Sequence, residues 1–407
     1  MMPDSAKGTQ RPPNGLTVAL LTGMLVVHNA QRMSVVPVFD ALRGRYGIDY
    51  AGVGTLFAAY VLGYAIFQTV IGLFGDRFDP RRLLLTGLAL SALWSALFAF
   101  ASDFHLALIL RFLLGATSAL LYTPAMSLGI LLFDRAQRGR VLGTIQVGAG
   151  VGMGGALIVV PLVLSRTGFT ASFLILPAIA LLLLTLAARL LPATAQRERT
   201  VRPAGSQSLA QRPDFWNLIA MNFSGMLASY GLLTWLPTYL SRDYGFSAVE
   251  AGSLSALFNA AMLLSAPLIG ILADRRGGRI GVLAVGSVLT VLCYLTIVPH
   301  QPLPVIILIA ILIGISMSAT TAPMMLFGGE RFGAADTSRV VGLFSSSAQI
   351  GAALAGSIFG VLLTRYDSFP LIWAVCATLA LVRVILFATL VRRDRKTAQP
   401  ILVAQTP

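Results

Sequence analysis

Twelve long apolar runs constrain the fold of this 407-residue chain more than any other feature of its sequence. A helix that spans the hydrocarbon core of a bilayer needs about 20 mainly apolar residues. With 56% hydrophobic residues, 11% charged residues and a mean hydropathy of +0.81, the chain is too apolar for a soluble domain. We therefore predict an all-α membrane protein with twelve transmembrane helices. The runs lie approximately at 15–42, 50–74, 82–102, 104–133, 139–165, 169–191, 214–240, 247–273, 279–299, 302–328, 337–364 and 368–391.

The loops between the runs divide the chain into two halves. The first run follows a polar segment without a small-x-small cleavage site, so we expect a retained helix and not a signal peptide. The longest loop is rich in Arg, Pro, Gln and Ser and separates the sixth run from the seventh. The predicted organisation is a cytoplasmic tail at 1–14, a six-helix bundle at 15–191, a cytoplasmic linker at 192–213, a second six-helix bundle at 214–392 and a cytoplasmic tail at 393–407.

The distribution of basic residues predicts how the chain is oriented in the membrane. If both termini are cytoplasmic, 22 of the 30 Lys and Arg residues lie in cytoplasmic segments, five lie in the opposite loops and three lie inside the runs. This asymmetry follows the positive-inside rule, so the net charge of +14 needs no nucleic acid to explain it. We predict a multi-pass protein of the cell inner (cytoplasmic) membrane, in contact with the lipid bilayer.

Three short patterns recur at nearly constant distance along the chain. GLFGDRFDPRR begins at Gly72, and GILADRRGGR begins 198 positions later, at Gly270. A Gly-x8-Pro spacing that starts at Gly115 returns 199 positions later, at Gly314. Gln-x-Gly at 146–148 returns at 349–351, an offset of 203. Helix n therefore corresponds to helix n+6, which predicts two parallel six-helix repeats with a site near the midplane at their interface, as in some transporters.

The duplicated Gly-x-x-x-Asp-Arg loop resembles the signature loop of the major facilitator superfamily, and the resemblance covers the whole chain. The first copy has Asp79 where a glycine is usual, whereas the second copy keeps Gly277. The resemblance implies that the loop acids latch one conformation on the cytoplasmic side, with Asp76 bonded to Arg138 or Arg140. The alternative is that these loops are only basic topology signals. The predicted gating residues are Asp76, Arg77, Arg138, Asp274 and Arg275.

Three further segments are similar to the anion:cation symporter group of this superfamily. They are LFAAYVLGYAIFQ at 56–68, RFLLGATSALLYTPA at 111–125 and TWLPTYL at 234–240. The group carries organic anions, and the resemblance implies that one substrate-binding arginine lies in helix 1 and another in helix 4. Arg32 and Arg111 match those two positions.

The depth of the two arginines supports the same pair. A charge in the hydrocarbon costs at least about 2.5–3.5 kcal/mol, so such residues usually face a bundle interior or a cavity. At 1.5 Å per residue, Arg32 lies about 15 Å and Arg111 about 12 Å from the extracytoplasmic helix ends. They are positioned to converge on one carboxylate, which suits the bidentate guanidinium. The alternative is that they only hold helices 1 and 4 together. Arg383 is expected to snorkel to the cytoplasmic surface and is left out of the site.

Other polar residues fall near these arginines at helical spacing. His28 and Asn29 share a helix face with Arg32. Charge recognition is assigned to the first half, and the second half is expected to close over the rest of the substrate. Each neighbour, taken alone, is also explained as a helix-packing residue. The predicted substrate-binding set is Arg32, Arg111, His28, Asn29, Tyr60, Tyr64, Ser118, Tyr122, Tyr230, Asn259 and Gln349.

No carboxylate lies deep in any run. All 16 Asp and Glu residues fall in tails, loops or helix ends. The resemblance leads us to expect an acid before the helix 1 arginine and another after the helix 4 arginine, but Gln31 and Ser118 occupy those positions. His28 is the deep group that remains for proton coupling. Facilitated diffusion, exchange of two anions, and proton movement on His28 or on the substrate all stay open.

The residues and motifs that the sequence lacks distinguish an anion carrier from a cation exporter and from an enzyme. A multidrug exporter of cations predicts deep acids, and the glycines of helix 5 match the antiporter frame only in part, since Val151 replaces the expected proline. The three separated histidines and two cysteines make no metal or catalytic constellation, and no nucleotide-binding loop is present. We predict a non-enzymatic carrier without cofactor or metal, monomeric as is usual in the family, that moves a small organic anion by alternating access through secondary active or facilitative transport. The alternatives are a multidrug or metabolite efflux transporter and, third, a non-transporting membrane sensor.

Overall fold

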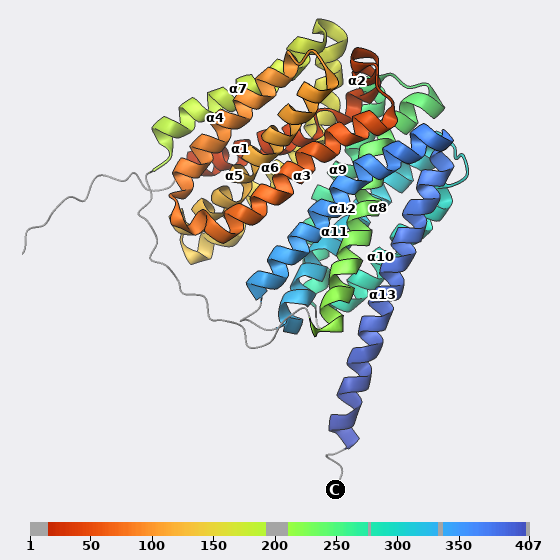
Figure 1. The fold of residues 1–407 in the computed structure, drawn as a ribbon. Helices are drawn as coiled ribbons and strands as arrows, with labels where there is room; N and C mark the ends of the chain where they lie inside the picture. The colour runs from red at the N-terminus through yellow and green to blue at the C-terminus, as the bar shows by residue number, and fades with distance from the viewer. Residues whose placement is uncertain (1–14, 193–210, 276–277, 333–336, 404–407) are drawn as a thin grey trace, which may run out of the picture.

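The computed structural model describes residues 15–192, 211–275, 278–332 and 337–403, without the side chains of 73, 76, 322, 325–332, 337–341 and 393–403. All described elements are helical (Figure 1). They are α1 (Gly15–Met33), η1 (Val36–Val38), α2 (Phe39–Tyr46), α3 (Tyr50–Phe74), η2 (Gly75–Arg77), α4 (Pro80–Ala99), α5 (Phe104–Leu132), α6 (Arg135–Thr167), α7 (Phe169–Leu190), α8 (Pro213–Tyr244), α9 (Ala248–Asp274), α10 (Gly278–Ile297), α11 (Leu303–Phe332), α12 (Thr337–Tyr366) and α13 (Phe369–Val403).

The first predicted helix is broken. We predicted one span at 15–42, but α1 ends at Met33 and the chain continues through the 3₁₀ turn η1 into the separate helix α2. Pro37 lies in this turn. A proline inside a helix removes one backbone hydrogen bond, and its ring clashes with the carbonyl four residues earlier. The break leaves the last carbonyls of α1 without partners from their own helix.

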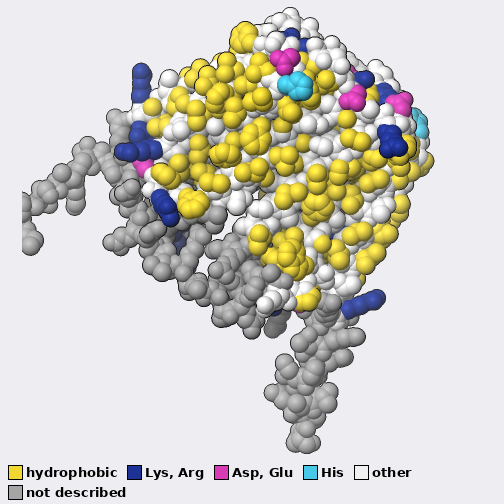
Figure 2. All heavy atoms as spheres, in the orientation of Figure 1, with side chains coloured by type: hydrophobic (Ala, Val, Ile, Leu, Met, Phe, Trp, Pro, Cys, Tyr) yellow, Lys and Arg dark blue, Asp and Glu magenta, His cyan; other side chains and the backbone are white. Residues whose placement is uncertain are grey.

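The helix lengths and surface confirm a membrane protein. Within the described residues, ten helices are long and apolar enough to cross a bilayer. The other two long helices, α1 and α8, carry more polar residues, and neighbouring helices bury much of each. Figure 2 shows a broad hydrophobic band across one face of the molecule, with charged side chains gathered toward its ends. The bilayer would cover this band, and the polar side chains of α1 and α8 stay inside the protein.

Equivalent helices pack in the same way in both halves, which confirms the predicted repeat. In the first half, α3 packs on α5, α1 on α6, and α4 on both α5 and α7. In the second half, α9 packs on α11, α8 on α12, and α10 on both α11 and α13. Each pair in the second half is the counterpart of a pair in the first half, six spans further along the chain. The fold is therefore two six-helix repeats in the same orientation.

The repeated glycines mark equivalent helix crossings. A Cβ atom on Gly115 would lie 2.7 Å from the carbonyl carbon of Tyr60, so α5 and α3 meet backbone to backbone. A Cβ atom on Gly314 would meet the carbonyl oxygen of Phe258 and lie 3.2 Å from the backbone nitrogen of Met262, which brings α11 onto α9. Small residues allow this close approach of membrane helices. The Gly-x8-Pro repeat therefore has a packing cause.

A Gly115→Ala substitution is expected to destabilise the protein. Alanine favours a helix over glycine by up to about 1 kcal/mol, but here its methyl group must push two helix backbones apart, and overpacking typically costs about 1–3 kcal/mol. Thermal unfolding of the purified protein measures the effect. Gly143→Ala is the control, because nothing lies within 4 Å of a Cβ atom at that position. Equal stability of both variants would show that α3 and α5 do not pack this closely.

The backbones of the two halves approach each other most closely toward one end of the molecule. We define the terminal side as the side where α1 begins and α7 ends, and the opposite side as the side of the α2–α3 and α12–α13 connections. At the opposite side the backbone of Gly54 in α3 meets that of Gly356 in α12, and the amide of Ala51 donates to Thr364 Oγ1 at 3.0 Å. Gly252 of α9 likewise approaches the carbonyl of Leu157 in α6. In Figure 1 the helices of the two halves converge toward this side.

Candidate substrate-binding site

The buried charges of the described residues are positive. The charged or titratable side chains in the buried polar set are His28, Arg32, Arg111 and Arg383, and none of the described Asp and Glu residues is buried. None of the three arginines takes part in an ion pair found among the described side chains. Burying an unpaired charge is unfavourable unless hydrogen bonds or a ligand compensate it. The interior therefore has an excess of positive charge.

Arg32 joins the two halves. It lies in the last turn of α1 and is 5% exposed. Its Nη2 donates to Gln349 Oε1 of α12 at 3.1 Å, and its guanidinium carbon lies 4.8 Å from the ring centroid of Tyr230 in α8. Its Nε has no hydrogen-bond partner in the described structure. The structure thus brings three predicted site residues together from two halves and leaves the buried Nε–H of the arginine without an acceptor.

His28, Tyr60 and Tyr64 form a cluster one turn from Arg32. The Tyr60 hydroxyl lies 3.2 Å from His28 Nδ1 and 3.1 Å from the His28 carbonyl oxygen. The rings of His28 and Tyr64 are 5.0 Å apart between centroids. All three side chains are buried, as predicted residues of one site would be. Asn29 is also buried, but its amide nitrogen donates to the Leu25 carbonyl of its own helix at 3.0 Å.

Arg111 binds the broken end of α1. Its Nη1 donates to the carbonyl oxygen of Gln31 at 2.9 Å and its Nη2 to that of Arg32 at 3.1 Å. Its Nε donates to the carbonyl oxygen of Leu56 at 3.4 Å. Two of these acceptors are among the carbonyls that the end of α1 leaves free. The predicted arginine pair is adjacent, but all three nitrogens of Arg111 are engaged by backbone oxygens.

The remaining predicted ligands surround this pair less closely. Tyr122 donates to Gln146 Oε1 at 3.3 Å, and Ser118 is fully buried on α5. Asn259 of α9 is 1% exposed, and neither polar atom of its side chain has a partner in the described structure. Gln31, which sequence reasoning noted only as a missing acid, is in the same state. Unpaired buried amides are rare and require an explanation such as a water or a ligand, so Gln31 joins the candidate set.

The predicted latch between Asp76 and Arg138 or Arg140 is not tested by the described side chains. The side chain of Asp76 lies outside the described residues. Arg77 is exposed with its guanidinium 5.0 Å from the Phe74 ring, and Arg138 Nε donates to the Phe133 carbonyl at 3.0 Å. Asp274 lies 4.0 Å from Arg279, and Arg275 is exposed. The latch stays a prediction.

The expectation that Arg383 snorkels to the surface is wrong. Its side chain is 4% exposed and turns into the second half. Nη2 donates to Thr290 Oγ1 at 3.0 Å and Nη1 to Thr320 Oγ1 at 3.4 Å. Glycine at 225 leaves room for it, because a Cβ atom there would lie 2.6 Å from Nη1. This contact joins α8 to α13, and a spacing pattern within either helix does not reveal it.

Two parallel six-helix repeats, with polar and positive groups buried where they meet, define a membrane transporter. The profile of the Major Facilitator Superfamily matches residues 21–262 and 239–405. The chain belongs to this family, whose members are transporters and not enzymes. The resemblance of the duplicated loop is thereby confirmed.

Relatives of known description are distant. The probable sulfoacetate transporter SauU of Cupriavidus necator is 27% identical over 66% of this chain and 67% of its own length. The uncharacterized MFS-type transporter YceJ of Bacillus subtilis is 22% identical over 88% of this chain and 92% of its own. The probable anion transporter 3, chloroplastic, of Oryza sativa is 24% identical over 63% of this chain, and the matched part is 55% of its length.

Solved structures support the fold. The crystal structure of a bacterial homolog of the human lysosomal transporter Spinster, in an inward-facing and occupied conformation, matches with a TM-score of 0.75 at 16% identity, covering 94% of this chain and 95% of that one. The unoccupied inward-facing structure matches with a TM-score of 0.70 at 17% identity. At these identities the likeness shows a shared fold.

Proposed function

We propose that this protein is a secondary active or facilitative carrier of a small organic anion of the carboxylate or sulfonate type. The observation that carries the proposal is the set of buried arginines with no buried carboxylate among the described residues. A cargo with one negative group would compensate this charge, whereas a cationic drug would add to it. The names of the relatives, which include a probable sulfoacetate transporter and probable anion transporters, support the same substrate class.

Arg32 is the proposed anion ligand, and Arg111 positions it. An incoming carboxylate or sulfonate would take the Nε donor of Arg32 and replace Gln349 Oε1 as the acceptor of Nη2. A guanidinium binds an anionic oxygen more strongly than the neutral amide oxygen of Gln349 that the anion would replace. Arg111 fixes the backbone of Gln31 and Arg32. The rest of the proposed lining comprises His28, Asn29, Gln31, Tyr60, Tyr64, Ser118, Tyr122, Tyr230 and Asn259.

Alternating access is the proposed mechanism. The described state is closed at the opposite side through α3–α12 and α6–α9 contacts. Replacement of Gln349 by an anion would loosen a bond between the halves, which couples binding to their relative movement. The positive-inside asymmetry makes the terminal side cytoplasmic. We assign the latch residues Asp76, Arg77, Arg138, Asp274 and Arg275 to the state that closes this side.

The test is anion-dependent thermal stability and transport. Purified wild type is screened against mono- and dicarboxylates, sulfoacetate, sugar acids and phosphate, and the best anion is then used for uptake into proteoliposomes. A ligand at 100 times its dissociation constant stabilises the folded state by about 2.7 kcal/mol. We expect Arg32→Gln to lose both this stabilisation and uptake, whereas Arg365→Gln, which removes an exposed arginine of α12, keeps them. An Arg32→Gln variant that responds as wild type would contradict the proposal.

The efflux alternative has one supporting observation. Gly150 and Gly154 of α6 face Leu263 and Asn259 of α9 across the two halves, and these glycines belong to the antiporter-like frame. They explain close helix contact equally well. If no anion stabilises the wild-type protein but lipophilic cations do, the efflux function replaces the anion carrier.

A further inference from the structure

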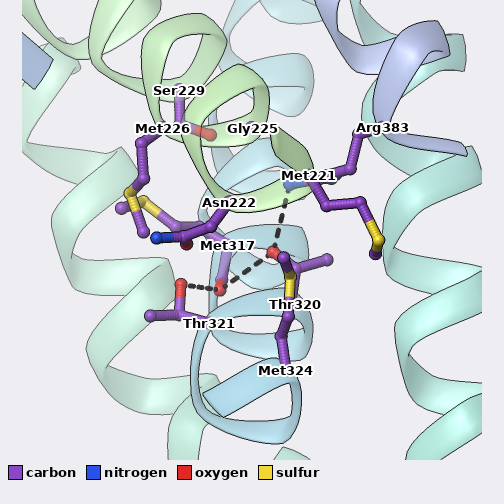
Figure 3. A pocket seen from close by; sticks show the side chains of 10 residues that line it. All are labelled: Met221, Asn222, Gly225, Met226, Ser229, Met317, Thr320, Thr321, Met324 and Arg383. Carbon is purple, nitrogen blue, oxygen red and sulfur yellow. Dashed lines mark hydrogen bonds between the residues drawn. The ribbon is translucent and has the colours of Figure 1, made fainter. Parts of the chain in front are cut away.

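Arg383 lines a pocket that the site around Arg32 does not include. The pocket lies between α8 and α11, with Arg383 entering from α13 (Figure 3). The guanidinium passes beside Gly225, where a Cβ atom would lie 2.6 Å from Nη1 and 2.9 Å from Cδ. An alanine at this position would obstruct this path. The glycine therefore lets the guanidinium of Arg383 reach the pocket from α13.

The charge of Arg383 has only neutral partners among the described residues. Its two terminal nitrogens donate to the hydroxyls of Thr320 and Thr290. Its Nε is buried and has no partner in the described structure. No ion pair found among the described side chains involves this arginine. A buried guanidinium ordinarily has a carboxylate or phosphate partner, since neutral acceptors compensate its desolvation less well. The described side chains around Arg383 therefore leave its positive charge uncompensated.

The rest of the lining indicates what kind of anion fits. Met221 and Met226 of α8 and Met317 and Met324 of α11 surround the polar groups, as Figure 3 shows. Methionine side chains adapt their shape to apolar ligands. In the described state the cavity volume is about 10 Å³, close to the space of one water molecule, so a cargo must displace the flexible methionine side chains to enter. The lining therefore suits a small cargo with one anionic group and a short carbon skeleton.

The pocket and the first site share α8, and the pocket lies nearer to the terminal side. Ser229, which lines it, is the neighbour of Tyr230, whose ring contacts Arg32. Gly225 is about 7.5 Å nearer to the terminal end of α8 than Tyr230, at 1.5 Å per residue. From this geometry, and on the basis of the proposed function, we infer that the Arg383 pocket is a second binding station. It receives the carboxylate or sulfonate of the cargo on Arg383, with its carbon skeleton against the methionines, between Arg32 and the terminal side.

The local charge of this pocket is measurable without knowing the substrate. A Ser229→Cys variant of the full chain, in lipid nanodiscs, is treated with 2-sulfonatoethyl methanethiosulfonate and, separately, with its trimethylammonium counterpart. The cysteine thiolate attacks the reagent, forms a mixed disulfide and releases methanesulfinate. A unit charge in the same pocket changes the rates of these two reagents in opposite directions, so Arg383→Gln should lower the ratio of anionic to cationic rate by about fivefold or more. Protein without the new cysteine gives the background from buried Cys293 and Cys376.

Two further variants make the result specific. Arg383→Lys keeps the charge and should keep most of the ratio, and Arg365→Gln removes an exposed charge from α12 and should leave it unchanged. The inference also predicts that an anion found to drive transport protects the introduced cysteine while Arg383 is present and fails to protect it after Arg383→Gln.

The outcomes separate this inference from the proposed function. A ratio unaffected by Arg383→Gln would overturn the second station even if Arg32→Gln abolishes uptake. Conversely, an Arg383-dependent ratio with uptake unaffected by Arg32→Gln would refute the proposed role of Arg32 and leave the pocket's anion preference standing.

Discussion

A Gly54→Ala variant should fold but lose most of its transport. In the described state a Cβ atom on Gly54 would meet the carbonyl oxygen of Gly356 and lie 2.8 Å from its carbonyl carbon. Both atoms belong to the backbone, so the clash with the added methyl group can be relieved only if α3 and α12 separate at the opposite side. Overpacking of about 1–3 kcal/mol in one state alone would lower its population by roughly 5–150-fold relative to the other state. The carrier would remain open to the opposite side and cycle slowly.

Folding should tolerate this change because other glycines hold α3 within its own half. Gly63 and Gly115 form the backbone contacts between α3 and α5. Uptake into proteoliposomes measures the loss. Disulfide formation between Ala51→Cys and Thr364→Cys, at positions hydrogen-bonded at 3.0 Å in the described state, reports closure of the opposite side. It should be slower when Gly54→Ala is added.

The matched control is Gly143→Ala, which adds the same methyl group at a position with nothing within 4 Å. It should transport as wild type does. If Gly54→Ala also transports at the wild-type rate, the contact between Gly54 and Gly356 is not part of the transport cycle, and the halves must close the opposite side in another way.

Sequence reasoning predicted the elements that depend on local properties of the chain. Span length and apolar character predicted the helices, and repeated glycines predicted the parallel halves because each repeat keeps the same backbone crossing. It missed the end of α1, because the apolar run continues through Pro37 without interruption. If a proline inside an apolar run is taken as a helix end, the break at this position is predicted.

Contacts between residues far apart in the sequence were harder to predict. Arg32 and Arg111 were selected from the resemblance to the anion:cation symporter group and from their depth, and Arg111 does bond the backbone of Arg32. The sequence did not show that Gln349 of the other half would bind Arg32, because that contact depends on how two bundles close. Arg383 was misplaced for a similar reason. Its direction is determined by Gly225 on another helix, and a lone arginine two turns from the predicted end of the run at 391 gives no sign of which way it points.

An Arg111→Met variant should be destabilised whether or not an anion is present. Methionine keeps much of the side-chain volume but removes donors to the carbonyls of Leu56, Gln31 and Arg32. The Gln31 carbonyl also accepts from Ser34 Oγ, and Leu56 lies inside α3, so the Arg32 carbonyl depends most on Arg111. Leaving a buried acceptor unpaired costs about 1–3 kcal/mol, and relief from desolvating the arginine offsets part of this cost. We expect a net loss of about 1–3 kcal/mol in the free energy of unfolding. Thermal unfolding with and without the stabilising anion measures it, and Arg140→Met, which removes an exposed arginine, is the control.

The comparison with Arg32 distinguishes the two roles that the sequence left open for Arg111. If Arg111 only holds the end of α1, Arg111→Met lowers stability while the remaining folded protein still gains stability from the anion, and Arg32→Gln does the reverse. If both guanidiniums hold the anion directly, Arg111→Met abolishes the anion-dependent gain as completely as Arg32→Gln does. Arg111→Lys sharpens the distinction, because one ammonium carries the charge for an anion but cannot reach three carbonyls that the guanidinium meets in different directions. An anion response that is lost in Arg111→Met and regained in an equally unstable Arg111→Lys would favour direct binding over a purely positioning role.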